Sequence, residues 1–396
     1  MLRPHRRRAL PVASAIDTAL LFGVIVGTIG LLTTGLGQEI APLDYRAPGI
    51  GIVLMAAAAL LGWRVLGHRL AEHEERVIVL GVTDAAKAIV ALAATRSSPL
   101  KILGFVDSAP DAQDHLPPGY ELLGKPEDVV DLAQQLTTDA IVVAPSEMRG
   151  RGPMDGLLEC RVRGIEVMDW PSFYERYAGK VPLTALRTSW LTFSQGFVRG
   201  RMTCVVKRAL DLIGAGLGLL LAGPLVVIIA LAIKLDSKGP VLFAQQRVGL
   251  GGRPFTLLKF RSMQPDAERL CGPAWASRRD PRVTRIGRIL RRTRLDELPQ
   301  LISVLQGDMS LVGPRPERPE FIPLLAEQLP FYALRHSVKP GLTGWAQVRQ
   351  GYAASIDEAR AKLECDIYYA KNLSLLLDLV ILLRTIPVIV TGRGAQ

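Results

Sequence analysis

Cysteine is scarce in this sequence, and charge is modest. The four cysteines are scattered and form no Cys-x-x-Cys pair or Cys/His cluster; they are Cys160, Cys204, Cys271 and Cys365. This distribution argues against a zinc site or a disulfide framework and is typical of domains that face a reducing compartment. Charged residues are only 21% of the chain and hydrophobic residues 49%. That balance excludes a disordered, collagen-like or disulfide-stapled protein.

The chain is too long for one ordinary domain. Its 396 residues predict two or three domains, at about 150 residues for each. The net charge of +11 predicts an anionic partner: nucleic acid, a membrane surface or a phosphorylated substrate. The long hydrophobic runs described next favour the last two.

Two apolar runs near the N-terminus predict a transmembrane hairpin over residues 1–70. The runs cover 12–36 and 49–63, and each approaches the roughly 20 residues that cross a bilayer, although the second is marginal. Arginine flanks the outer end of each run, whereas the linker between them carries acidic residues. The positive-inside rule therefore places both ends of the hairpin in the cytoplasm. A cleaved signal peptide is the weaker interpretation, because the first run is too long and no A-x-A site stands out.

A third apolar run covers 209–235 and contains Gly223-Pro224 at its centre. Proline breaks the helical hydrogen-bond ladder, and each arm would be only about 15–20 Å long, against a hydrocarbon core of roughly 30 Å. Basic residues flank both ends, so hydropathy leaves a spanning and a re-entrant helix equally open. A last run, 375–390, is short and interrupted, which predicts an interfacial helix.

Residues 71–195 predict a cytosolic α/β domain with a parallel sheet. Strand-like runs at 76–81, 102–106 and 140–144 alternate with helical stretches. Only Gly81 is present where a dinucleotide-binding fingerprint would need G-x-G-x-x-G, so the domain is a degenerate Rossmann-like one. A structural role, or one in a homodimer, is favoured over nucleotide binding.

The region 238–370 carries the chemistry. Apolar runs at 241–244 and 255–258 around a glycine-rich turn predict a β-hairpin. Lys259 and Arg261 follow it two residues apart, on one face of a strand, as a phosphate clamp would require. An exposed basic edge is the alternative.

Eight arginines and one aspartate occupy residues 278–294. Aromatic residues that would stack on bases do not alternate with them, and no helix-turn-helix follows, so a nucleic-acid partner is not expected. Asp296-Glu297 come next. Beside so many arginines, Asp296 is expected to have a lowered pKa, to cap a helix reaching Leu305, and to attack phosphorus. Glu297 would hold Mg²⁺. An isolated Asp-Glu pair is more often only a solvated helix start.

Longer motifs decide between these interpretations. They are KFRSM at 259–263, DELPQL at 296–301, GDMSLVGPRPE at 307–317 and KPGLTGWAQ at 339–347. Together they strongly resemble the bacterial sugar transferase family of monotopic phosphoglycosyl transferases over roughly residues 200–396. The segment from Phe173 through Gly179-Lys180 to Ser189-Trp190 also resembles the exopolysaccharide branch associated with PEP-CTERM systems.

The resemblance implies a two-step reaction. Asp296 would attack the sugar-bearing phosphorus of a UDP-sugar, expel UMP and hold the sugar phosphate covalently until undecaprenyl phosphate takes it. Glu297 matches the family's Mg²⁺ ligand. Arg291 and Arg315 match positions that contact phosphate or nucleotide, and Lys259 and Arg261 are less firmly matched. Asp308 either supports this loop and the metal or simply caps a turn.

The resemblance also implies the topology. Because UDP-sugars are cytosolic, the helix at 209–235 would be re-entrant, and both globular parts would face the cytoplasm at the bacterial inner membrane. The expected architecture is therefore a hairpin (1–70), a Rossmann-like domain (71–195) and a monotopic catalytic domain (196–396) that works with exopolysaccharide assembly machinery.

The sequence departs from the family's usual pattern at three places. Gly223-Pro224 replaces Ser-Pro, Val348-Arg349-Gln350-Gly351 follows the Trp-Ala-Gln motif, and Cys365-Asp366 replaces Tyr-Asp. The last two concern sugar specificity, and the sequence does not name the sugar. The competing hypothesis is an inactive membrane scaffold whose Rossmann-like domain senses a nucleotide; the complete Asp-Glu and arginine set favours the enzyme.

Overall fold

The computed structural model describes residues 74–95, 99–144, 154–198, 200–264, 282–350 and 355–391. The hairpin predicted for 1–70 lies outside these residues. The chain divides into two compact units, one ending at Gly179 and one beginning at Lys180. Residues 180–195, which the sequence analysis assigned to the middle domain, lie in the second unit. There the Val181 amide donates to the carbonyl of Glu364 (3.2 Å), and the Lys371 ammonium lies 4.0 Å from the ring centroid of Trp190.

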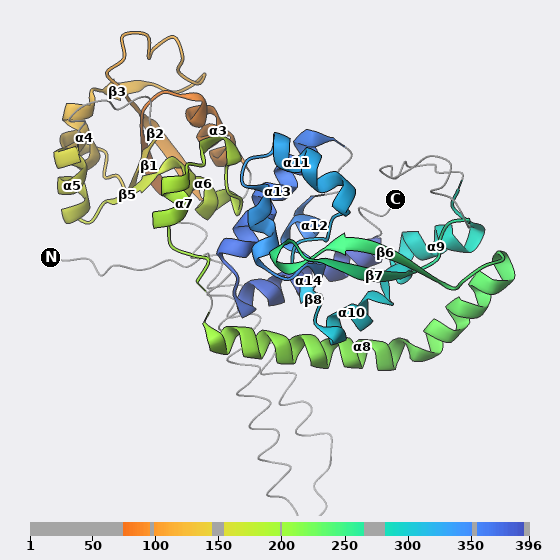
Figure 1. Ribbon diagram of the computed structural model, residues 1–396. Coiled ribbons are helices and arrows are strands. Elements are labelled where there is room, and N and C mark those ends of the chain that lie inside the picture. Colours follow the sequence, from red (N-terminus) through yellow and green to blue (C-terminus); the bar gives the residue numbers. More distant parts are fainter. Residues whose placement is uncertain are drawn as a thin grey trace, which may run out of the picture. The chain divides into compact units, whose positions relative to one another are not determined.

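The first unit is a five-stranded parallel sheet between helices, as predicted. Its strands are β1 (Glu75–Leu80), β2 (Leu100–Val106), β3 (Leu122–Gly124), β4 (Ala140–Val143) and β5 (Glu166–Asp169), in the order β3-β2-β1-β4-β5. Its helices are α3 (Asp84–Ala93), α4 (Val129–Gln135), α5 (Met154–Val162) and α6 (Trp170–Ala178). Figure 1 shows α4 and α5 on one face of the sheet and α3 and α6 on the other. The apolar residues of β1, β2 and β4 form its core.

The loop after β1 is closed by its own chain. Gly81 adopts φ +102°, a conformation that favours glycine, and the next residue, Val82, donates its amide to the Asp107 carboxylate at 2.6 Å. Asp107 stands just after β2 and also accepts from the Ala109 amide at 2.9 Å. The Val82 amide therefore binds a carboxylate of the protein itself, at the position where the glycine-rich loop of a dinucleotide-binding domain would bind a phosphate.

The second unit contains most of the remaining elements. After α7 (Thr188–Phe193) and α8 (Arg201–Asp236) come the hairpin β6 (Leu242–Val248) and β7 (Pro254–Phe260), then α9 (Arg285–Thr293), η4 (Leu295–Glu297), α10 (Gln300–Gln306), β8 (Ser310–Val312), α11 (Ile322–Gln328), η6 (Tyr332–Ser337), β9 (Gly341–Thr343), α12 (Trp345–Arg349), α13 (Ile356–Lys371) and α14 (Leu375–Thr391). The hairpin is antiparallel, as predicted, and β8 pairs with β9 in parallel.

Helix α8 runs along the second unit and bends in its second half (Figure 1). It is 36 residues long and includes Pro224. It is the one helix in the described part that is long and apolar enough to cross a membrane by length and composition, and only 11% of its most apolar window is buried. A core helix of a soluble protein would be mostly buried. The exposed apolar surface therefore suggests association with a membrane. The re-entrant path remains a prediction.

One side of α8 holds it to the rest of the unit. Ala215 packs against Leu301 and Met309, whereas Ile229 and Ile233 pack against Phe260 and Leu290. Asp211 is buried, and its carboxylate accepts hydrogen bonds from the Ser310 hydroxyl (3.0 Å) and the Leu311 amide (2.9 Å). The helix is thereby joined directly to β8.

Candidate active site

Asp296 and Glu297 lie in a tight turn between α9 and α10. Arg294 ends α9 in the left-handed conformation (φ +61°), so the chain reverses and the single 3-10 turn η4 presents both carboxylates inward. Each residue is less than a tenth exposed. The predicted helix cap is wrong: α10 begins at Gln300 with Pro299 as its N-cap, and the intervening 3-10 turn removes Asp296 from the capping position.

Glu297 forms a forked ion pair with Arg315. Its Oε1 accepts from Nη2 of Arg315 at 2.7 Å and its Oε2 from Nη1 at 3.3 Å, and Arg294 adds a weaker contact at 3.5 Å. Burial raises the pKa of Glu297, but the charges of Arg315, Lys259 and Arg294 outweigh burial and hold this pKa well below its usual range. Glu297 is therefore a permanent negative charge.

Asp296 shows the opposite shift. Burial and the adjacent Glu297 carboxylate raise the pKa of Asp296, and the cations Lys259, Arg315 and Arg291 only partly oppose this. The expected lowering is thus wrong, because the sequence shows the arginines but not the loss of water around the carboxyl group. Within the described residues, Oδ1 of Asp296 is buried and has no hydrogen-bond partner.

The two cations after the hairpin have different environments. The ammonium of Lys259, the penultimate residue of β7, is close enough to the acidic pair to be influenced by both carboxylates. Burial, followed by the charge of Arg315, lowers its pKa to about 8. Arg261 is buried, and its guanidinium donates to the carbonyls of Lys238 (2.9 Å) and Ser237 (2.8 Å). The predicted clamp thus keeps Lys259, whereas the terminal nitrogens of Arg261 bind the segment after α8.

Arg291 and Asp308 are also placed differently from one another. Arg291 is in the last turn of α9, and its charge acts on Asp296. Asp308 is exposed just after α10, and its charge acts on Lys339, which also experiences the charges of Arg208 and Asp211. The structure therefore gathers Asp296, Glu297, Lys259, Arg291 and Arg315, and places Asp308 near Arg208 and Lys339.

Two residues that contact this site were not predicted from the sequence. Arg294 lies 3.5 Å from the Glu297 carboxylate, and its position directly before the Leu-Asp-Glu segment could have indicated this contact. Arg335 is buried and donates to the carbonyl of Arg315 at 2.7 Å, which supports the loop that carries the guanidinium. No local pattern around Arg335 indicated this contact, because the two residues are twenty positions apart.

The acidic pair has the chemistry of a magnesium site. Mg²⁺ prefers one or two carboxylates together with substrate phosphate oxygens. Glu297 is the carboxylate that would hold the ion, because its Oε2 keeps a lone pair beyond its contact with Arg315. No group of three or more His, Cys, Asp or Glu residues that could hold a metal occurs in the described part of the chain. The phosphates would therefore complete the shell.

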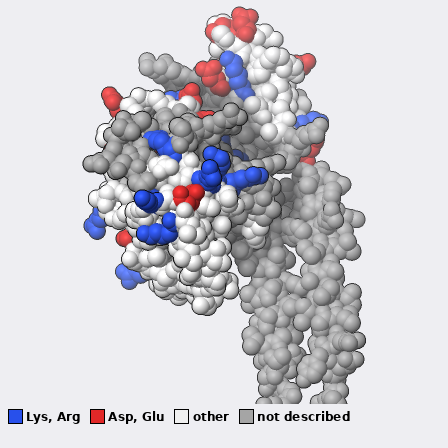
Figure 2. Space-filling model, turned by 90° about the vertical axis from the view of Figure 1, so that its right-hand side faces the viewer, with Lys and Arg blue, Asp and Glu red and all other residues white. Residues whose placement is uncertain are grey.

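The surface on this side of the protein is basic. Figure 2 shows the face that carries α9, where several Lys and Arg side chains gather beside a small acidic patch. Such a field attracts anions. Together with the buried carboxylates, it describes a site for a phosphorylated ligand rather than for a neutral one.

Comparison with known proteins identifies the family. The sequence profile of the bacterial sugar transferases matches residues 202–392. The chain is 43% identical over 240 residues, 61% of its length, to a UDP-N-acetylgalactosamine-undecaprenyl-phosphate N-acetylgalactosaminephosphotransferase of Aeromonas hydrophila, covering 56% of that protein. It is 40% identical over 280 residues, 69% of its length, to an undecaprenyl-phosphate glucose phosphotransferase of Komagataeibacter xylinus, covering 52% of it. The chain thus spans about half the length of these two relatives.

A shorter relative is matched over its whole length. It is an exopolysaccharide production protein of Rhizobium leguminosarum bv. phaseoli, 44% identical over 199 residues, which are 49% of this chain and 100% of that protein. The matched profile contains the acidic pair, the arginines around it and α8. The chain therefore belongs to the bacterial sugar transferase family.

Proposed function

We propose that the protein transfers a hexose-1-phosphate from a UDP-sugar to undecaprenyl phosphate, releasing UMP and starting exopolysaccharide assembly. The relatives from Aeromonas and Komagataeibacter are named for such transfers, and the Rhizobium relative for exopolysaccharide production. The observation that carries the proposal is the buried pair of Asp296 and Glu297 surrounded by Lys259, Arg291 and Arg315.

Asp296 is the proposed nucleophile. Its unpartnered oxygen attacks the phosphorus that bears the sugar, the bond to UMP breaks, and the sugar phosphate stays on the carboxylate. The phosphate oxygen of undecaprenyl phosphate then attacks the same phosphorus, so the aspartyl bond breaks and a diphosphate-linked sugar leaves. The raised pKa of Asp296 supports this role, because a more basic carboxylate is a stronger nucleophile once ionised.

The surrounding cations neutralise the phosphates. Arg315 and Lys259 both act on the acidic pair, so phosphate oxygens placed against Asp296 come under the influence of both charges. Glu297 keeps the Arg315 guanidinium in place through its forked contact. Mg²⁺, held by Glu297, would supply further neutralisation of the diphosphate.

The proposed location is the bacterial inner membrane, with both units in the cytoplasm. The exposed apolar side of α8 supports contact with lipid, and the proposed donor is a cytosolic metabolite. In this arrangement α8 enters one leaflet, and the acidic pair lies near the headgroups, where the lipid phosphate of the acceptor is found.

UMP release tests the proposal. The full chain, in detergent with undecaprenyl phosphate and Mg²⁺, is given UDP-glucose and UDP-N-acetylgalactosamine beside Asp296→Asn. We expect release with one of the donors and its abolition in the variant, whereas the matched change at an exposed carboxylate of the first unit, Asp131→Asn, leaves release intact. Release that survives Asp296→Asn would contradict the nucleophile. No release from a folded sample with a broader panel of UDP-sugars would support the scaffold hypothesis.

A further inference from the structure

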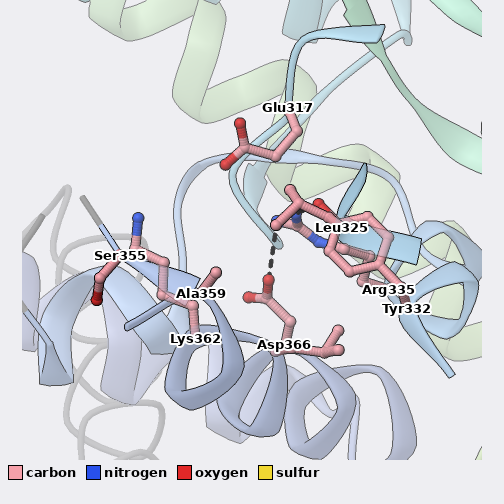
Figure 3. A pocket seen from close by; sticks show the side chains of 9 residues that line it. Glu317, Leu325, Tyr332, Arg335, Ser355, Ala359, Lys362 and Asp366 are labelled. Atoms are coloured by element: carbon pink, nitrogen blue, oxygen red, sulfur yellow. Dashed lines mark hydrogen bonds and ion pairs between the residues drawn. The ribbon is translucent and has the colours of Figure 1, made fainter. Parts of the chain in front are cut away.

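A polar cavity lies next to the proposed phosphate site. Figure 3 shows it between α13, η6 and the loop that follows Arg315. It is open to solvent. The polar side chains that line it come from Glu317, Tyr332, Arg335, Ser355, Lys362 and Asp366. The proposed reaction assigns none of these side chains a role except that of Arg335, which supports the loop that carries Arg315.

The inner end of the cavity is fixed by a buried ion pair. Arg335 and Asp366 are 2.8 Å apart, and their side chains are 7% and 3% exposed. Arg335 also donates to the hydroxyl of Tyr332 at 2.6 Å, while its Nε has no hydrogen-bond partner in the described residues. These contacts make the inner wall rigid, so a ligand would meet preformed polar groups.

The outer part of the cavity carries an unused carboxylate. Glu317 is half-buried, and its side chain forms no hydrogen bond or ion pair with the described residues. Figure 3 shows Glu317 extending from the loop above the cavity and Lys362 rising from α13 below it, with Ser355 at the N-cap of that helix. A carboxylate, an ammonium and a hydroxyl therefore surround one opening and offer both acceptors and donors.

The charges of this cavity balance, unlike those of the acidic-pair site. Glu317 and Asp366 oppose Arg335 and Lys362, whereas cations outnumber carboxylates around Asp296 and Glu297. A balanced set has no excess charge to neutralise a phosphate. It suits a neutral ring with vicinal hydroxyls, which donate to a carboxylate and accept from an ammonium or guanidinium.

The cavity is also joined to the phosphate site. Arg335 donates to the main-chain carbonyl of Arg315 at 2.7 Å, and Glu317 is only two residues further along the chain. The charge of Arg315 also acts on Lys362, although burial is the larger cause of the lowered pKa of that lysine. A molecule whose phosphate meets the Arg315 guanidinium therefore has its next groups close to this cavity.

We propose that this cavity binds a hydroxyl-bearing ring of the donor, either the hexose or the ribose, through Glu317 and Lys362. The inference rests on the proposed function, because it takes a nucleotide sugar as the ligand.

Binding measurements test this separately from turnover. The full chain carrying Asp296→Asn, which blocks the proposed covalent step, is titrated calorimetrically with UMP, UDP-glucose and UDP-N-acetylgalactosamine. The same titrations follow with Glu317→Gln or Lys362→Met added, and with Glu327→Gln, an exposed glutamate of α11, as the matched control. We expect each cavity variant to weaken binding of a UDP-sugar about ten-fold, the value of one charge-assisted hydrogen bond. The control should bind normally.

The three ligands separate the two rings. Weaker binding of the UDP-sugars with unchanged UMP binding assigns the cavity to the hexose, and weaker binding of all three assigns it to the ribose. Unchanged affinities in both cavity variants, or no binding of any nucleotide to the Asp296→Asn protein, overturn the inference. Thermal unfolding of each variant identifies a loss caused by misfolding. UMP release by the unmodified chain reports independently on the proposed function.

Discussion

Two adjacent carboxyl groups differ in pKa because only one is paired. Glu297 pairs with both terminal nitrogens of Arg315, whereas one oxygen of Asp296 has no hydrogen-bond partner among the described residues. Their pKa values consequently move apart, with that of Glu297 lowered and that of Asp296 raised. Such divergence assigns different tasks to chemically similar groups: a fixed charge and a reactive oxygen.

Replacing Arg315 should lower both the free energy of unfolding and the rate of UMP release. Arg315→Ala leaves Glu297 buried without its main counter-charge, at a cost of about 3 kcal/mol in the free energy of unfolding. We also expect UMP release to fall roughly 100-fold, as when one preorganised donor is lost. Arg315→Lys keeps the charge but not the fork, so it should recover stability more than activity. Denaturant unfolding and UMP release measure both, and equal recovery of the two would contradict this account.

Lys259 should make activity and stability respond oppositely to alkali. Its pKa of about 8 means that the ammonium loses its proton as pH rises through 8, so kcat/KM should fall there. The unfolded chain, with an ordinary lysine pKa of about 10.4, still binds that proton. Between about pH 8 and 10.4 the unfolded state holds more protons, so this residue's contribution to stability increases with pH.

Lys259→Arg is the control for that pH dependence. Arginine stays charged throughout this range, so the decline of kcat/KM near pH 8 should disappear, and the residue's pH-dependent stability with it. Steady-state rates and denaturant unfolding from pH 7 to 10 measure the two quantities. An unchanged decline in the variant would mean that another group titrates.

At the scale of elements, α8 combines a packed side with an exposed one. Leu220 and Leu221 are 73% and 80% exposed, whereas Ala215 is fully buried. Changing both leucines to Glu should leave unfolding nearly unaltered, because neither packs in the core, but should abolish binding to anionic lipid vesicles. Vesicle flotation of a chain beginning at Lys180 measures this without residues 1–73. Leu324→Glu, on α11, is the control, and flotation of the double variant would contradict lipid contact through this side.

Some strands could be predicted from local sequence patterns, and others could not. The runs that became β1, β2 and β4 were recognisable because they are apolar and β-branched, and the glycine-rich turn indicated the β6–β7 hairpin. Strand β3 has three residues, and β5 has only four, with a charged residue at each end, so neither stands out. The motifs singled out charged residues that the structure gathers around Asp296 and Glu297, but the turn at Asp296 and the contacts of Arg261 depend on long-range packing that spacing does not encode.

At the scale of the molecule, the second unit should function alone. The Rhizobium relative is matched over its whole length by about half of this chain. A chain of residues 180–396 is expected to keep UMP release within about two-fold, because the proposed site lies in that unit. A chain of 196–396 should unfold at a lower temperature, since it loses the contacts of Val181 with Glu364 and of Trp190 with Lys371. Equal melting temperatures would contradict this boundary.

The attachment of α8 to β8 has a consequence for the whole enzyme. The Asp211 carboxylate accepts hydrogen bonds from Ser310 and Leu311 of β8, and the chain reaches Arg315 four residues after Leu311, beyond the end of the strand. In the proposed membrane arrangement, the helix that contacts lipid is thus connected through β8 to the guanidinium that pairs with Glu297. Bilayer thickness and lateral pressure become variables of catalysis, and turnover in vesicles should change with acyl-chain length even when donor and acceptor concentrations are held constant.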